Sequence, residues 1–139
     1  MSPEVESGSL TIEPVENTNT IKAGMESILT SIKKLLGLSE DYEHFDTDII
    51  IHINTVFMTL TQLGVGPSKG FNIKDKTAVW SEFIPEDDLR FEGVKTYVYL
   101  KVRLVFDPPS SSAVIESYNR TINELECRLN YNAETSTDG

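Results

Sequence analysis

The segment from Val94 to Phe106 constrains the fold more than any other part of the chain. Its apolar residues alternate as in a strand, but it is more than twice the usual strand length of about 5–6 residues. No second segment of comparable quality could pair with it, and a lone strand leaves its backbone hydrogen bonds unsatisfied. As a helix from about Asp88 to Phe106 it is apolar on nearly all sides, which is typical of a central helix. Pro108 and Pro109 end it.

Two helices are predicted before this central one. Apolar residues at helical spacing indicate a first helix that begins between Thr20 and Met25 and is closed by Gly37. A second begins at Asp46, whose carboxylate can cap the first amides, and ends before Gly64. Its buried face is expected to comprise Ile49, Ile53, Val56, Phe57, Leu60 and Leu63.

A last helix is expected after the serines at 110–112, with one narrow apolar stripe. The stripe consists of Ile115, Tyr118, Ile122, Leu125 and Leu129. The fold class is therefore all-α, a small helical bundle of about four to five helices with a long connection and flexible N- and C-terminal tails. We divide the chain into an acidic N-terminal extension (1–23), a helical domain (24–130) and a C-terminal tail (131–139). The two ends have too little apolar area to offset the entropy cost of ordering them.

Composition excludes several classes of function. The 139 residues suit one domain. The net charge of −10 disfavours sequence-independent binding to nucleic acid, because such binding needs cationic side chains. No apolar run approaches the ~20 residues of a membrane helix, and the N-terminus lacks the pattern of a secretory signal. Cys127 is the only cysteine, which excludes an internal disulfide, fits a reducing compartment and predicts inert packing.

No pattern for catalysis is found. His44 and His52 lie in no metal-ligand spacing, and one thiol cannot complete a cysteine-rich metal site. The acidic run from Glu40 to Asp48 lacks the glycine and the final carboxylate of a calcium loop. We therefore predict no catalytic, metal or cofactor-binding residues, and no enzyme.

Residues 66–88 form a long connection with one short helix around 76–83. Connections of more than ~12 residues in compact domains are uncommon and often functional, so this stretch is a candidate contact surface. Its large aromatic residues are Phe71, Trp80 and Phe83. The alternative is a loop folded back on its own domain with Trp80 as its anchor.

The order of these elements resembles the small head-tail connector proteins (adaptor or head completion proteins) of long-tailed double-stranded DNA bacteriophages. The resemblance covers roughly residues 25–130 and depends most on Asp46-Thr-Asp48, the Gly64 stop and Phe106-Asp-Pro-Pro109. It implies an all-α virion protein whose copies form a ring, often of twelve, at the head-tail interface. The ring would contact the portal protein above and a further connector or tail terminator below, with DNA passing through without specific binding.

Within that hypothesis, chemistry suggests three contact regions. Phe71, Trp80 and Phe83 are candidate anchors to a neighbour, because buried aromatic residues dominate interface energies. Tyr131 and the C-terminal tail are candidates for ordering on the portal, and Arg120 and Arg128 could pair with acids of the adjacent copy. The competing hypothesis is a small acidic helical adaptor or regulator that binds a basic protein partner.

Overall fold

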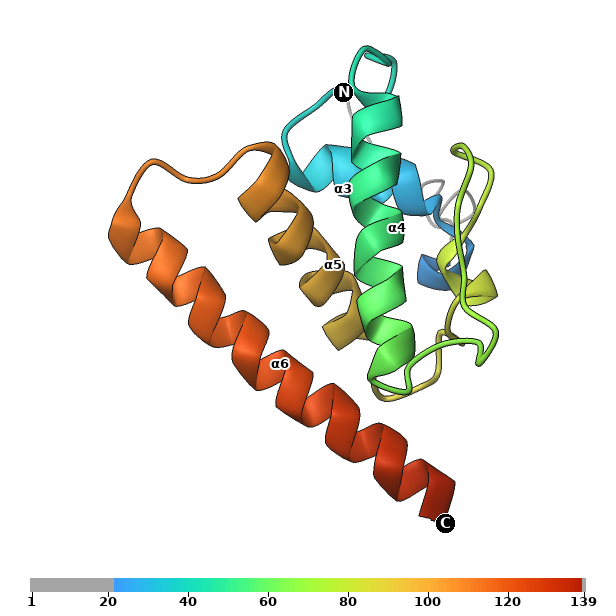
Figure 1. Cartoon of the computed structure of the whole chain (residues 1–139). Helices are drawn as coiled ribbons and strands as arrows, with labels where there is room; N and C mark the ends of the chain where they lie inside the picture. Colours follow the sequence, from blue (N-terminus) through green and yellow to red (C-terminus); the bar gives the residue numbers. More distant parts are fainter. Residues whose placement is uncertain (1–21, 139) are drawn as a thin grey trace, which may run out of the picture.

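The computed structural model describes residues 22–138, with the backbone alone over 132–138. The described chain is helical and contains only an isolated bridge between Ser27 and Val79 in place of strands. Its elements, shown in Figure 1, are the 3-10 turns η2 (Ala23–Met25) and η3 (Trp80–Glu82) and the helices α3 (Ile28–Leu35), α4 (Asp46–Gln62), α5 (Phe91–Phe106) and α6 (Ser112–Asp138). The all-α prediction is confirmed. The expected N-terminal extension lies largely outside the described residues.

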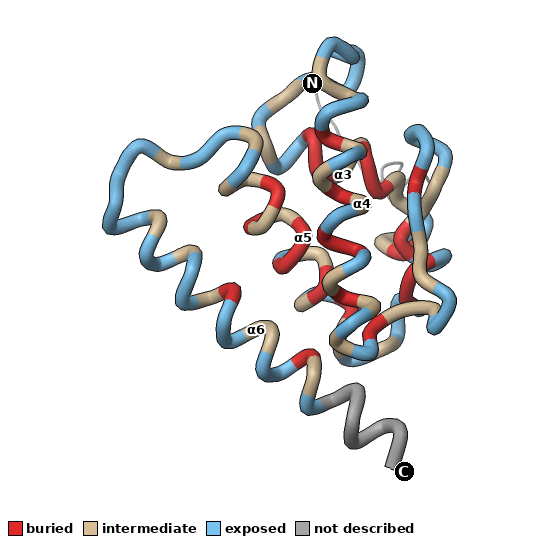
Figure 2. Tube along the Cα trace, in the orientation of Figure 1, coloured by how far each residue is buried: buried red, intermediate tan, exposed pale blue. Residues whose placement is uncertain are grey.

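Helix α5 is the central element, as its apolar character predicts. It packs against α3, α4 and α6, and Val94, Tyr97, Val98 and Val102 are completely buried. Figure 2 shows the buried residues concentrated on α3, α4, α5 and the long connection. The helix ends at Asp107, which leaves the helical region with φ −150° and ψ 71° ahead of the two prolines.

Helix α4 buries five of the six residues that the sequence assigns to its inner face, and Leu63 is half-buried. The predicted cap is wrong, because Asp46 is the first residue of the helix and Phe45 precedes it without a side-chain cap. The Asp46 carboxylate forms an ion pair with Lys33 of α3 at 2.8 Å instead. Lys33 is 2% exposed and donates a hydrogen bond to the Glu40 carbonyl at 3.0 Å. This lysine therefore fixes the loop between α3 and α4.

Helix α3 begins later than its pattern predicts. Ser27 caps it, accepting a hydrogen bond from the Thr30 amide at 3.1 Å. The residues before Ser27 cannot join the helix because their backbone pairs with the long connection. The Trp80 amide donates to the Glu26 carbonyl at 3.2 Å, and the Ile28 amide donates to the Ala78 carbonyl at 2.9 Å.

Helix α6 lies along α5 and extends beyond the rest of the bundle (Figure 1). Its stripe faces inward, with Ile122 and Leu129 buried, and Ser111 Oγ accepts from the Val114 amide at 3.4 Å. The helix continues to Asp138, through residues predicted as a tail, since no proline or glycine interrupts it before Gly139. None of the helices in residues 22–138 is both long and apolar enough to span a bilayer.

Candidate assembly surfaces

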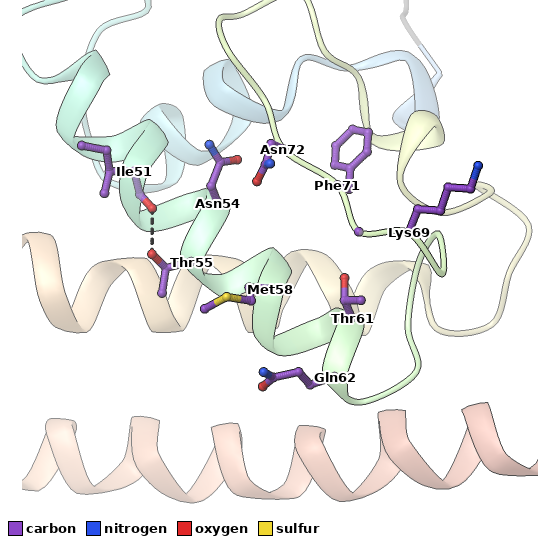
Figure 3. A pocket seen from close by; sticks show the side chains of 10 residues that line it. Ile51, Asn54, Thr55, Met58, Thr61, Gln62, Lys69, Phe71 and Asn72 are labelled. Atoms are coloured by element: carbon purple, nitrogen blue, oxygen red, sulfur yellow. Dashed lines mark hydrogen bonds between the residues drawn. The ribbon is translucent and has the colours of Figure 1, made fainter.

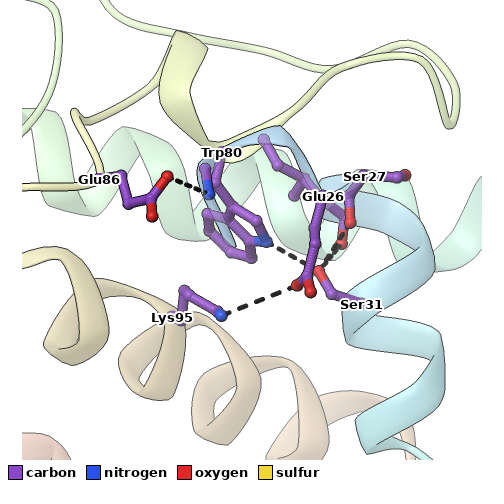
Figure 4. A network of polar contacts seen from close by, with 8 residues as sticks. Glu26, Ser27, Ser31, Trp80, Glu86 and Lys95 are labelled. Carbon is purple, nitrogen blue, oxygen red and sulfur yellow. Dashed lines mark hydrogen bonds and ion pairs between the residues drawn. The ribbon is translucent and has the colours of Figure 1, made fainter. Parts of the chain in front are cut away.

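Trp80, the first candidate anchor, lies in the core of its own chain. Its exposed fraction is 0%, and its indole Nε1 donates a hydrogen bond to Ser31 Oγ at 2.8 Å (Figure 4). The Ser31 hydroxyl in turn donates to the Ser27 carbonyl at 2.7 Å. No surface of the indole is left for a partner, so the folded-back interpretation describes this loop. The helix expected around residues 76–83 is reduced to the single turn η3.

Phe71 and Phe83 pack with Trp80 around Phe57 of α4. The Phe83 ring stacks on Phe57 with centroids 4.5 Å apart, and the Phe71 ring meets Phe57 edge-on at 5.3 Å. Phe83 is 3% exposed, so it is also a core residue, whereas Phe71 is half-buried. Of the three aromatic candidates, only Phe71 retains surface that another molecule could contact.

That exposed part of Phe71 borders a hollow of about 670 Å³ between α4 and the long connection (Figure 3). The α4 side is an exposed stripe at helical spacing, formed by Ile51, Thr55, Met58 and Gln62. Asn54 holds the opposite wall, because its side chain accepts from the Ile73 amide at 2.8 Å and donates to the Ile73 carbonyl at 3.0 Å. The hollow is therefore a fixed feature of the surface.

The outer face of α6 carries the remaining candidates. Arg120, Arg128 and Tyr131 are all exposed, and Tyr131 is 67% exposed. Cys127 lies on this face too, so the prediction that it packs inside is wrong. Its position falls opposite the inward stripe of the helix. The structure thus places these side chains together on one long helix, away from Phe71.

A tyrosine on α5 fixes the inner face of α6. The Tyr97 hydroxyl donates to the Glu126 carboxylate at 2.7 Å. Burial, together with this hydrogen bond and the neighbouring negative charge, raises the pKa of Tyr97 far above its usual value. The hydroxyl stays protonated at neutral pH and holds α6 in register.

The cations of α5 are engaged within the chain. Lys95 lies 4.0 Å from the Glu26 carboxylate (Figure 4) and also lies above the Phe91 ring. Arg103 donates to the Asp107 carbonyl at 2.6 Å and to the Tyr99 hydroxyl at 3.1 Å, and Lys101 lies above the Tyr97 ring. Each of these cations therefore has a partner within its own chain.

Metal binding finds no support among the described side chains. Within residues 22–131, no three His, Cys, Asp or Glu residues lie close enough to share a metal ion. The hollow beside α4 is lined by hydroxyl, amide and apolar groups with one lysine. Such a lining suits contact with another chain better than acid-base chemistry.

Comparison with known proteins identifies the family. The family model described as "Phage connector protein" matches residues 28–136, which spans α3 to α6. The chain belongs to this family. No curated protein and no solved structure matches the chain. Membership makes the chain a structural connector of the phage virion at the head-tail junction, one that assembles with head and tail components.

Sequence reasoning missed two features of these surfaces. The hollow could have been found, since Ile51 and Met58 are apolar, lie seven residues apart and fall outside the buried face of α4. The Lys33–Asp46 pair had no signal, because the two residues belong to different helices at no characteristic spacing.

Proposed function

We propose that this connector forms a ring beneath the portal, joins the phage head to the tail and continues the channel for DNA. The observation that carries the proposal is that the described residues leave two different faces exposed, the outer face of α6 and the α4 stripe. A ring repeats a head-to-tail contact, which needs two unlike patches on each subunit. The core between them is rigid, because α5 packs on both helices.

The α6 face supplies the proposed contacts. Arg120 and Arg128 would pair with acids of the adjacent copy, and Tyr131 with the following turns of α6 would pack on the portal. Exposed arginine and tyrosine side chains are the types most enriched where interfaces concentrate binding energy. Trp80 and Phe83 are not part of this proposal, since both are buried.

The charge of the chain supports a channel. With a net charge of −10, a ring of twelve copies would carry a strongly negative surface. Phosphates are repelled by carboxylates, so DNA would pass without being held. A further connector or a tail terminator would close the lower side of the ring.

The test is native mass spectrometry and negative-stain imaging of the full chain, alone and with portal rings. We expect ring-shaped particles or a stable complex with the portal. The double variant Arg120→Glu/Arg128→Glu should stay folded and fail to assemble. The matched control, Lys22→Glu/Lys34→Glu, changes the net charge equally at exposed sites elsewhere and should assemble normally. A strictly monomeric protein that ignores the portal would overturn the proposal. Capture of basic proteins by that monomer would favour the acidic regulator.

A further inference from the structure

The hollow beside α4 differs in charge from the rest of the chain. Lys69 is the only charged residue among those that line it. Between Ile49 and Ser81 the sequence has a single acid, Asp75, against Lys69, Lys74 and Lys76. The net charge of this region is therefore positive, in a chain whose total is −10. An acidic segment is attracted here and repelled by most other surfaces.

The 21 residues that precede Lys22 have the complementary character. They contain four glutamates, no lysine and no arginine. Leu10 and Ile12 alternate with polar residues, and Pro14 follows them, a pattern that favours extended backbone. An extended segment presents apolar side chains on one side, which suits the exposed Ile51 and Met58 of the hollow, at 56% and 58% exposure.

The described chain, to which this segment is joined, also begins near the hollow. The described chain begins beside η2, which contacts η3. Glu82 of η3 lines a second hollow of about 360 Å³, which shares Phe71 and Asn72 with the first. From Leu10 to Lys22 an extended chain spans about 40 Å, which is about three times the radius of gyration of a domain of this size. The apolar residues can therefore reach the α4 stripe of the same copy.

We propose that the acidic N-terminal segment, residues 1–21, occupies the α4 hollow of its own chain. Leu10 and Ile12 pack on the α4 stripe. The carboxylates of Glu13 and Glu16 lie on the side of Lys69. The covalent tether supports this occupant over a second copy, because it keeps the segment at a high local concentration. In a ring, the patch beside α4 would then consist of this segment lying on the α4 stripe, so the two proposals are compatible.

The test is disulfide trapping in the full chain, with Cys127→Ser as background because Cys127 is exposed. The variant Leu10→Cys/Met58→Cys is compared with Leu10→Cys/Val105→Cys, since Val105 on α5 is equally exposed, at 60%. We expect an intramolecular disulfide at least about tenfold faster in the Met58 variant, which corresponds to ~1.4 kcal/mol of preference. Adding Lys69→Glu should slow this reaction and leave the Val105 pair unchanged.

Two results would overturn the inference. Equal rates for the Met58 and Val105 pairs would show that the segment does not prefer the hollow. Disulfide-linked dimers in place of the internal product would assign the hollow to another copy. Melting temperatures of the reduced variants serve as the folding control, because each substituted residue within the described structure is exposed. Loss of trapping with normal rings would reject this inference and leave the ring proposal intact.

Discussion

Replacing Trp80 by alanine separates a core role from an interface role. The indole is fully buried against Phe57, and its N–H donates to Ser31. Loss of a buried tryptophan side chain costs ~3–5 kcal/mol in transfer and cavity terms. The hydrogen bond adds ~1 kcal/mol. We expect Trp80→Ala to lower the free energy of unfolding by about 4–6 kcal/mol, or the melting temperature by roughly 15 °C.

The assay is thermal and urea unfolding followed by circular dichroism at 222 nm, a helix wavelength. The variant Trp80→Phe keeps most of the ring volume and should lose about half as much stability. Ser31→Ala removes the acceptor and leaves the buried indole N–H unpaired, for an expected loss of ~1–3 kcal/mol. Tyr131→Ala, at an exposed site, is the control and should stay within about 0.5 kcal/mol of the parent chain.

An unchanged melting temperature for Trp80→Ala, combined with failure to assemble, would refute the burial of this residue. The long connection would then be an exposed contact surface. A large loss of stability for Trp80→Ala without any loss for Ser31→Ala would support the packing of the indole. It would also show that the hydrogen bond to Ser31 adds no stability.

The remaining predictions concern three other contacts, checked by unfolding. Gly66 and Gly37 both have positive φ, but only a Cβ at Gly66 would collide with a core aromatic ring. Gly66→Ala should therefore cost well above the ~1 kcal/mol expected for Gly37→Ala, and equal losses would contradict this. Lys33→Met leaves a partly buried carboxylate unpaired, so a loss of ~2–3 kcal/mol is expected, and a neutral result would contradict it. Folding raises the pKa of Tyr97, so its contribution is complete below the unfolded value near 10 and is lost as pH rises above it. Tyr97→Phe should reduce this alkaline loss, and an unaltered pH profile would contradict the assignment.

The central helix shows how far a local pattern can predict this fold. Alternation alone favoured a strand from Val94 to Phe106. Three other observations favoured a helix: the length of the segment, the missing partner strand and the prolines at 108 and 109. That decision used information beyond the segment itself, and the structure confirms it. The predicted start of α3 was wrong because the backbone of residues 26–28 pairs with the long connection, which overrides the helical pattern.

The candidate site was less predictable because an aromatic residue in a loop has the same sequence signature in a core as in an interface. Trp80 is a core residue because it contacts Ser31, which lies 49 residues away in the sequence, and Phe57 on another helix. The α4 hollow was accessible in principle, since the buried face of α4 was assigned from the sequence and Ile51 and Met58 remained outside it. In this chain, aromatic content pointed to two residues that the core buries, Trp80 and Phe83.

Anchoring of the long connection has a consequence for assembly. A connection of this length would ordinarily be free to rearrange on contact with a neighbour. Here the cluster around Phe57 and the two hydrogen bonds between Asn54 and the Ile73 backbone hold it against α4. Assembly therefore has no entropy cost for ordering this loop, because the loop is already ordered in the single subunit. Contacts with a neighbouring subunit can then use only exposed side chains, and those described include the α4 stripe and the outer face of α6.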